Sequence, residues 1–411
     1  MLHTVGFIGL GKLGMPCAEV MATRYKVYGY DIKPVESDYI TVLKTLEETV
    51  EVADIIFVAV QTPHDPKYDG SRPLARLPNV DFDYSVVKDT LDQIEKVVKP
   101  HQIVVLISTV LPGTVRRELI QHIPTARFVY NPYLIAMGTV AHDMQNPEMI
   151  IIGTEDGMLT DDAKEVTEFY RPLMHNAPDM HVGTWDEAEA IKIFYNTFIS
   201  MKLSLVNMIQ DVAELNGNMN VDVVTHALQR AKHRITGPKY MTAGMGDAGP
   251  CHPRDNIALR YMSEKLDLGY DLFDSIMRSR ECQAGNLAWR LNELSREHDL
   301  PMFIHGKAYK PGIDILDGSY SMLVGHYIEK TMGKELTYID PLTEDSVPDE
   351  IKGVVLLAHC PAVTYDDQFR PLQLYCNIAE GSVILDPWRR YEDKRDSVTV
   401  IHYGNTRNSS T

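Results

Sequence analysis

The chain has 411 residues, which at about 100–200 residues per domain predicts two or three domains. Hydrophobic residues make up 44% and charged residues 24%, as in globular proteins, and no apolar run reaches the roughly 18–20 residues of a membrane helix. The net charge of −17 argues against a general nucleic-acid or anionic-membrane binder.

The cysteines and the first residues of the chain indicate the cellular compartment of the protein. The five cysteines are scattered and never in CxxC spacing. This argues against a disulfide framework or a structural zinc site, so we expect no metal and a reducing compartment. The first residues lack the basic region and cleavage site of a signal peptide, and we therefore expect a cytoplasmic protein.

Short buried strands alternate with helical stretches over the first part of the chain. The pattern predicts strands at residues 4–8, 26–30, 55–60, 103–108, 128–130 and 149–152. Strands that alternate with helices are typical of a parallel, doubly wound sheet.

The second part begins with a helical stretch. Residues 186–215 place apolar side chains at helical spacing without Gly or Pro, which predicts one long helix between two lobes. Helical character resumes over residues 256–298, and the α/β pattern returns with strands at 302–304, 354–358 and 383–386 and a helix at 320–332. We predict an α/β fold in which two Rossmann-like, doubly wound parallel-sheet domains (1–185 and 300–411) are joined by the long central helix and a helical middle domain (186–299).

A glycine motif follows the first predicted strand. Gly9, Gly11 and Gly14 have the GxGxxG spacing, and Asp31 follows the second predicted strand. These glycines permit a tight turn, the approach of a pyrophosphate and close helix packing, while the aspartate would bond the ribose of NAD and repel the 2′-phosphate of NADP. Lys33 lies beside this predicted cofactor site. The alternative is a glycine turn without a ligand.

Cys251 differs from the other cysteines in its surroundings. The glycine-containing loop from Gly246 to Gly249 leads into it, and Pro253 and a helical pattern follow. A helix dipole there would stabilise a thiolate. A lone cysteine is more often a small buried hydrophobe, which we expect for the other four cysteines: Cys17, Cys282, Cys360 and Cys376.

Lys192 and Asn196 lie four residues apart on the long predicted helix and therefore share a face. Such a pair can hold a substrate oxygen and stabilise negative charge on it. The alternative is a solvated lysine beside a polar neighbour.

Taken together, these motifs resemble the UDP-glucose/GDP-mannose dehydrogenase family over nearly the whole chain. Members of this family oxidise a nucleotide-sugar alcohol to a carboxylate with two NAD+. The resemblance rests on the motifs above and on further segments in the family's order: Val60-Gln-Thr62-Pro63, Ser108-Thr109-Val-Leu-Pro-Gly113-Thr114, the AExxKxxxN pattern at Lys192 and Asn196, Arg234 to Tyr240, Cys251 and Asp255 in a GGxCxxKD-like segment, and Ala308-Tyr-Lys310-Pro.

The resemblance implies an NAD-dependent nucleotide-sugar 6-dehydrogenase that oxidises a UDP-glucose-like primary alcohol to the uronic acid through a thiohemiacetal and a thioester on Cys251. It implies three groups of site residues: catalytic Cys251, Lys192, Asn196, Asp255 and Thr109; cofactor-binding Gly9, Gly11, Gly14, Asp31, Lys33, Thr62 and Pro63; and substrate-binding Arg234, Tyr240, Gly246, Gly249, Lys310 and Arg389. The long helical span predicts a homodimer through the middle domain.

The sequence departs from the family pattern at several positions. Tyr133 and Met137 replace both glutamates of its NPEFLxEG segment, while Asp247, Ala248 and Asp317 replace an aromatic residue, a glycine and an arginine. Two alternatives therefore stay open. One is a nucleotide-sugar-binding protein with impaired catalysis. The other is a β-hydroxyacid dehydrogenase, which shares the glycine motif and a KxxxN helix.

Overall fold

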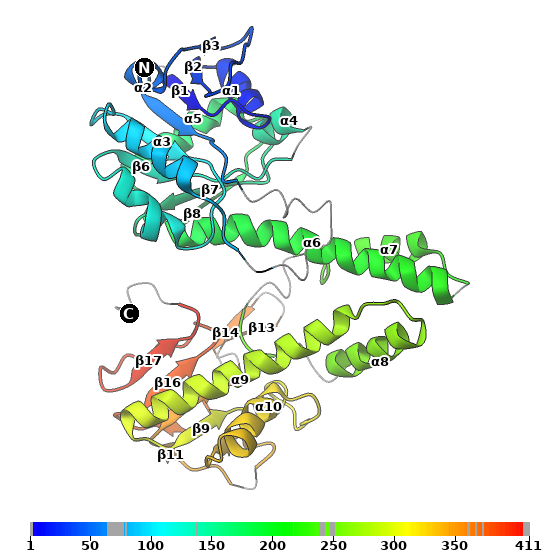
Figure 1. Ribbon diagram of the computed structural model, residues 1–411. Helices are drawn as coiled ribbons and strands as arrows, with labels where there is room; N and C mark the ends of the chain where they lie inside the picture. Colours follow the sequence, from blue (N-terminus) through cyan, green and yellow to red (C-terminus); the bar gives the residue numbers. More distant parts are fainter. Residues whose placement is uncertain are drawn as a thin grey trace. The chain divides into compact units, whose positions relative to one another are not determined.

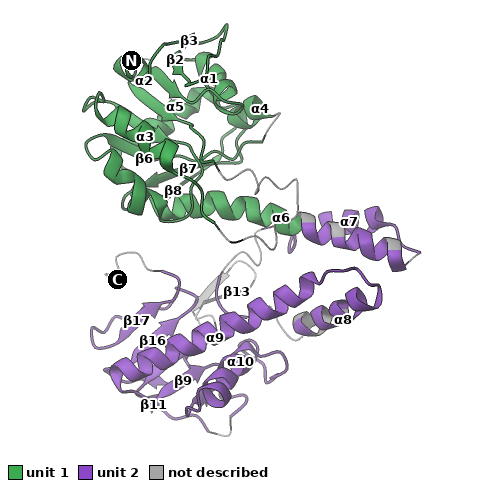
Figure 2. Ribbon diagram, in the orientation of Figure 1, with its two compact units in different colours: residues 1–202 green, residues 203–411 purple. Residues whose placement is uncertain are grey.

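The computed structural model describes residues 3–63, 78, 80–136, 139–216, 218–237, 243–246, 251–344, 346–359, 362–365, 368–371 and 374–405. These residues form two compact units, 1–202 and 203–411 (Figure 2). The predicted division into three domains remains a prediction.

Unit 1 is built on an eight-stranded sheet (Figure 1). Its strand order is β3-β2-β1-β4-β5-β6-β7-β8, and every neighbouring pair is parallel except β6 and β7. The strands are β1 (Thr4–Ile8), β2 (Lys26–Tyr30), β3 (Thr41–Val42), β4 (Ile55–Val58), β5 (Ile103–Leu106), β6 (Arg127–Tyr130), β7 (Met149–Thr154) and β8 (Asp179–Thr184). The helices are α1 (Gly14–Ala22), α2 (Leu46–Glu51), α3 (Ser85–Glu95), α4 (Val140–Gln145), α5 (Asp161–Tyr170) and the first part of α6 (Trp185–Asn216).

Both faces of this sheet are covered by helices. In β4, Ile55 and Phe57 pack with the apolar side chains of α1, α4 and α5, whereas Ile56 and Val58 pack with those of α2, α3 and α6. All four side chains are fully buried, as the uniformly apolar sequence of a central parallel strand requires. The strand order reverses direction at β1, so the carboxyl ends of β1 and β4 flank the switch point where doubly wound sheets bind ligands.

Unit 2 contains a smaller parallel sheet of order β10-β9-β12-β16-β17. Its strands are β9 (Met302–His305), β10 (Thr337–Ile339), β12 (Val354–Leu357), β16 (Val383–Asp386) and β17 (Thr399–His402), and short pairs form between β11 (Glu350–Ile351) and β15 (Asn377–Ile378) and between β13 (Ala362–Tyr365) and β14 (Gln368–Pro371). Helices α9 (Leu272–His298) and α10 (Tyr320–His326) pack on one face of the sheet, and the unit also contains α7 (Val221–Gln229) and α8 (Cys251–Lys265).

These observations confirm the predicted fold class of two Rossmann-like parallel sheets and a long helix. The helical character predicted over residues 256–298 corresponds to two helices, α8 and α9, which are separated by a turn. Asp267 and Gly269 have φ values of 51° and 77° there, and the Asp271 side chain accepts hydrogen bonds from the first backbone amides of α9. A left-handed residue and a new N-cap end one helix and begin another.

The burial of the cysteines differs in part from the prediction. Cys17 and Cys376 are buried, but Cys282 is exposed on α9, so the prediction that it packs in the core is wrong. Cys360 lies outside the described residues. Among the described residues, no helix is long and apolar enough to cross a membrane, and no group of His, Cys, Asp and Glu could hold a metal ion.

Two buried histidines lie at the carboxyl ends of β9 and β12. The His305 ring stacks on Tyr375 with centroids 4.6 Å apart, and its Nε2 accepts the Tyr375 backbone N–H at 2.8 Å. His359 Nε2 lies 2.8 Å from the Ala308 carbonyl oxygen, to which it donates. Burial lowers the pKa of His305 to about 4 and also lowers that of His359. Both rings are therefore neutral in the folded protein at pH 7.

We expect unit 2 to lose stability as the pH falls from about 6.5 to 4. The unfolded chain binds a proton at His305 in this range and the folded chain does not, so this residue alone costs up to about 3 kcal/mol. His305→Phe should reduce the dependence of the unfolding free energy on pH, as measured by denaturant unfolding at pH 7, 5.5 and 4.5. His326→Gln, at an exposed position on α10, should leave it unchanged. Equal slopes for wild type and His305→Phe would contradict the assignment.

Candidate active site

The glycine loop after β1 has the features of a cofactor loop. Gly9 has a φ of +96°, its N–H donates to the Tyr30 carbonyl oxygen at 2.9 Å, and a Cβ there would lie 2.7 Å from the Ala59 carbonyl oxygen. A Cβ on Gly14, the first residue of α1, would overlap the Gly9 carbonyl oxygen. A Cβ on Gly11 would meet nothing within 4 Å. Gly9 and Gly14 are therefore required by the chain itself, whereas Gly11 borders open space that a ligand can enter.

Asp31 follows β2 and connects it to this loop. One carboxylate oxygen accepts the Leu10 N–H at 2.8 Å, and the other accepts the Lys33 N–H at 2.8 Å. The Lys33 side chain is exposed. The aspartate thus fixes the loop and retains oxygen lone pairs for further hydrogen bonds.

The segments that follow β4 and β5 are joined to each other. Thr62 Oγ1 donates to the Thr109 carbonyl oxygen at 3.0 Å, and Ser108 Oγ donates to the Val60 carbonyl oxygen at 2.6 Å. Thr62, Thr109 and Pro63 are half-buried. Three of the predicted residues thus lie on adjoining segments at the carboxyl edge of the sheet.

The first part of α6 carries both charged and polar site residues. Lys192 is 9% exposed, burial lowers its pKa, and it has no hydrogen bond or ion pair to any residue that the structure describes. Asn196, one turn further, is exposed. Glu189, one turn before Lys192, is fully buried and accepts the backbone N–H groups of Gly113 and Val115, the latter at 2.7 Å. Glu189 was not among the predicted site residues, although the AExxKxxxN pattern contains it.

Tyr133 has a structural role. Its hydroxyl lies 2.6 Å from the Tyr170 hydroxyl, which donates to the Asn131 side-chain oxygen at 2.6 Å, and its ring packs against the core of unit 1. Burial raises the pKa of both phenols well above the usual value. Tyr133 therefore cannot act as a base at neutral pH.

Several predicted residues fall outside the described structure. Tyr240 and Gly249 lie outside the described residues, as do Met137, Asp247 and Ala248. Cys251 is the first residue of α8, as the predicted helix start requires, but its side chain and that of Asp255 are not described.

The remaining predicted residues of unit 2 have varied surroundings. Arg234 is exposed, and exposed Lys310 places its Nζ 5.4 Å from the centre of the Tyr309 ring. The Arg389 guanidinium donates to the carbonyl oxygens of Pro387, Tyr403 and Ala243 at 2.5, 3.0 and 2.7 Å, so it holds backbone segments of its own unit together.

Unit 2 repeats the loop geometry of unit 1. Gly306 follows β9 with a φ of +100°, and its N–H donates to the Ile339 carbonyl oxygen at 2.9 Å. Asp340 follows β10 and accepts the N–H groups of Lys307 and Ala308 at 2.9 and 3.0 Å. Gly306 and Asp340 are the counterparts of Gly9 and Asp31, and this repeat was not predicted from the sequence.

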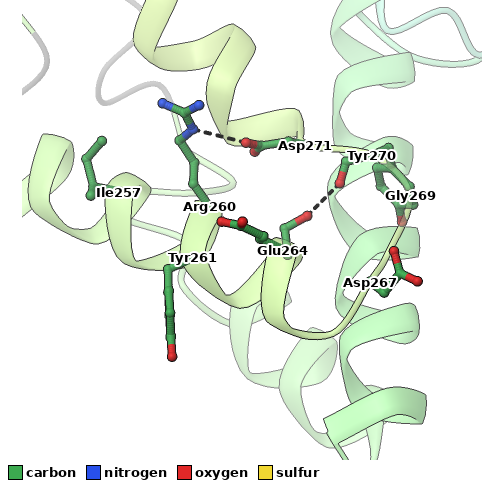
Figure 3. A pocket seen from close by; sticks show the side chains of 9 residues that line it. Ile257, Arg260, Tyr261, Glu264, Asp267, Gly269, Tyr270 and Asp271 are labelled. Carbon is green, nitrogen blue, oxygen red and sulfur yellow. Dashed lines mark hydrogen bonds and ion pairs between the residues drawn. The ribbon is translucent and has the colours of Figure 1, made fainter.

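Two cavities are lined by described residues of unit 2. One, of about 570 Å³, lies at the corner between α8 and α9, where Arg260 Nε donates to Asp271 at 3.0 Å beside Glu264 and Tyr270 (Figure 3). It contains none of the predicted site residues. The other, of about 460 Å³, is lined by the predicted residue Gly246 together with residues of α8, α9 and α10: Asn256, Ile276, Ser279, Arg280, Gln283 and Tyr320.

Comparison with protein families identifies the chain. The NAD binding domain of the UDP-glucose/GDP-mannose dehydrogenase family matches residues 33–174, and the central domain of the same family matches residues 186–281. This chain belongs to the UDP-glucose/GDP-mannose dehydrogenase family. The cofactor is therefore NAD, as predicted, and the open space at Gly11 fits it.

The individual relatives of this chain are distant. UDP-glucose 6-dehydrogenase YwqF of Bacillus subtilis is 26% identical over 366 residues, which cover 83% of this chain and 77% of that protein. GDP-mannose 6-dehydrogenase of Pseudomonas putida is 26% identical over 351 residues, which cover 76% and 75%. A crystal structure of GDP-mannose dehydrogenase from Pseudomonas aeruginosa matches the fold with a TM-score of 0.75 and 19% identity, covering 96% of this chain and 99% of that one.

The glycine geometry leads to a paired prediction. Gly11→Ala should leave the stability within about 0.5 kcal/mol of wild type, because its Cβ meets nothing, but should weaken NAD+ binding by at least about tenfold, because the methyl group occupies the ligand's approach. Gly14→Ala should lower the stability by about 1–3 kcal/mol because of its overlap with Gly9. Thermal unfolding and NAD+ titration measure both effects. Unchanged NAD+ affinity in Gly11→Ala would place the cofactor elsewhere.

Proposed function

We propose that this chain oxidises the primary alcohol of a UDP-glucose-like nucleotide sugar to the uronic acid in two NAD-dependent steps. The observation that carries the proposal is a hydrogen-bonded connection within unit 1. It runs from Thr62 beside the cofactor loop to Thr109, and from the loop that contains Thr109 through Glu189 to the helix that bears Lys192. Thr62 and Thr109, on the cofactor side, and Lys192, which would stabilise charge, thereby belong to one rigid part of unit 1.

The cofactor site would be formed by the glycine loop, Asp31, Thr62 and Pro63. The amides at the start of α1 favour the pyrophosphate, and the Asp31 carboxylate accepts hydrogen bonds from the ribose hydroxyls. When bound, NAD accepts the hydride in each oxidation.

Lys192 and Asn196 would hold the substrate oxygen. A buried ammonium group without a partner among the described residues gains most from an oxygen on which negative charge develops, because few other charges or waters compete for it. The exposed amide of Asn196 lies one turn further along the same face of α6 and can donate to the same oxygen.

Cys251 would capture the aldehyde formed in the first oxidation. Its thiolate attacks the carbonyl carbon, and the oxygen takes up a proton to give a thiohemiacetal. Loss of that proton and of a second hydride leaves a thioester, and water then displaces the thiolate and releases the carboxylate. The start of α8 at Cys251 favours the thiolate.

Water activation would depend on Asp255 and Thr109. The hydroxyl of Tyr133 is engaged with Tyr170 and stays protonated, so it cannot replace a carboxylate base. A base four residues after the thiolate on the same helix is one turn from it, which suits attack on a thioester at Cys251.

We further propose a homodimer that uses α6. Phe194, Phe198 and Met201 follow one face of this helix at i, i+4 and i+7 and are 65%, 45% and 60% exposed. A stripe of large apolar side chains at helical spacing is typical of an interface, and a second copy of the chain supplies a matching stripe by two-fold symmetry.

Incubation with NAD+ and a panel of UDP- and GDP-sugars tests the activity. We expect two NADH per sugar consumed, with a UDP-glucose-like sugar preferred. Cys251→Ala should abolish the formation of the acid, and Cys282→Ala, which removes an exposed thiol on α9, should retain full turnover.

Other results would favour the alternatives. One NADH from a small hydroxy acid would indicate a β-hydroxyacid dehydrogenase. Tight binding of sugar nucleotides without NADH would indicate a binding protein, which is the reading that the engaged hydroxyl of Tyr133 favours.

Analytical ultracentrifugation tests the dimer. Wild type should sediment with the mass of two chains. Phe198→Glu, which places a charge in the middle of the stripe, should sediment as one chain. Val86→Glu introduces the same charge at a 40% exposed site on α3 and should remain dimeric. A monomeric wild type would refute the proposed interface.

A further inference from the structure

Glu189 is a fully buried carboxylate without a cationic partner at hydrogen-bond distance among the described residues. Both of its oxygens are used by backbone: one accepts the Gly113 N–H and the other the Val115 N–H, at 2.7 Å. These amides belong to the segment after β5, which leads from Thr109 into the helical turn Val115–Leu119. A buried carboxylate held by two amides is a strong and geometrically specific anchor.

The same segment has a second, weaker anchor. The Leu111 N–H donates to the Tyr84 hydroxyl at 3.3 Å, and the Thr114 hydroxyl lies 3.4 Å from it. Both distances are long for hydrogen bonds, and both bonds are to a neutral group. Glu189 is therefore the principal side chain that fixes the backbone of residues 113–115.

The position of Glu189 on α6 connects this anchor to Lys192. It lies three residues before Lys192 on α6, so the two side chains share a face of one helix. A carboxylate that binds the Thr109 segment from this helix fixes the distance between the Thr109 backbone and Lys192. A hydrophobic residue could fill the same volume, but it would leave two buried amides without acceptors.

We propose that Glu189 is a positioning residue, which holds the segment containing Thr109 in register with the Lys192 and Asn196 face of α6. This inference rests on the proposed function for the role of those residues. Its structural part, the anchoring of residues 113–115, does not depend on which sugar is the substrate.

The surroundings make this anchor sensitive to pH. Burial raises the pKa of Glu189 to about 7, the two backbone amides oppose that rise, and Asp186 on the same helix adds to it. Arg117, from the following turn, lowers the pKa, and Tyr130 on β6 and Lys192 are the other titratable groups of this region. Protonation turns one acceptor oxygen into a donor, so one of the two amide bonds is lost as the pH falls below about 7.

Hydrogen exchange of Glu189→Gln tests the anchor directly. The glutamine amide has one acceptor oxygen, and its NH2 group faces a backbone donor, so one amide of the pair loses its partner. At pH 8 we expect the peptide that contains residues 108–119 to exchange at least about tenfold faster than in wild type. This readout needs neither cofactor nor sugar.

Gln102→Leu is the matched control. Gln102 is fully buried in the same unit, and it also serves backbone groups, because its Nε2 donates to the Val50 and Ala53 carbonyl oxygens at 2.6 Å. It precedes β5, at the opposite edge of the sheet from Thr109. Its substitution should lower the melting temperature without changing exchange in residues 108–119.

Kinetics with the NADH-producing sugar completes the test. Glu189→Gln should lower kcat by about 100-fold with little change in the KM for NAD+, because a displacement of about 1 Å between catalytic groups has that cost. The kcat of wild type should decrease as the pH falls below an apparent pKa near 7, and Glu189→Gln should lack this acidic limb of the pH profile. Gln102→Leu should retain both kcat and the limb.

Two results would overturn the inference. Unchanged exchange of residues 108–119 in Glu189→Gln would show that the carboxylate is not the anchor. An equal loss of kcat in Glu189→Gln and Gln102→Leu would reduce its effect to general stability. If no sugar yields NADH while exchange responds as expected, the proposed function fails and the anchor stands.

Discussion

In each unit, a carboxylate at the end of the second strand of the sheet fixes the loop that follows the first strand. Asp31 accepts the Leu10 N–H, and Asp340 accepts those of Lys307 and Ala308. The loop begins in both cases with a glycine of positive φ whose N–H is bound by the second strand. With these amides satisfied inside the protein, the loop keeps one conformation at the edge where strands end and ligands bind.

The two units differ in the residues that lie beside this loop. Gly9 and Gly306 are both enclosed, because a Cβ on Gly9 would lie 2.7 Å from the Ala59 carbonyl oxygen and a Cβ on Gly306 would lie 2.6 Å from Cγ of His359. The loops differ two residues further along the chain, where a Cβ on Gly11 would meet nothing within 4 Å but the equivalent residue of unit 2, Ala308, is 1% exposed. The same backbone geometry therefore leaves space beside the loop of unit 1, whereas the loop of unit 2 is packed.

The features predictable from sequence were those that depend on local spacing. The GxGxxG motif, Asp31 and the apolar strands indicated the sheet of unit 1, and the long helix was found because residues 186–215 lack Gly and Pro. The partnership of Glu189 with Gly113 was not predictable, because 76 residues separate them and a glutamate on a helix is ordinarily a surface residue. The repeat at Gly306 was missed because Asp340 lies 33 residues beyond Lys307, whereas only 21 separate Leu10 from Asp31.

The contacts of α6 explain how an acidic protein can keep a buried cation available to an anionic ligand. A buried lysine is expected to pair with a carboxylate, and Glu189 lies one turn away on the same helix. Both oxygens of Glu189 already accept backbone amides, and the geometry of those bonds directs the carboxylate toward residues 113–115. Lys192 consequently keeps its hydrogen-bonding capacity, and burial lowers its pKa because no anion within the described part of the chain compensates the lost hydration. A group in that condition binds an anionic oxygen more strongly than a solvated lysine does, since less water has to be displaced. The backbone of the Thr109 segment, by occupying the carboxylate, therefore makes the ammonium group available to a ligand.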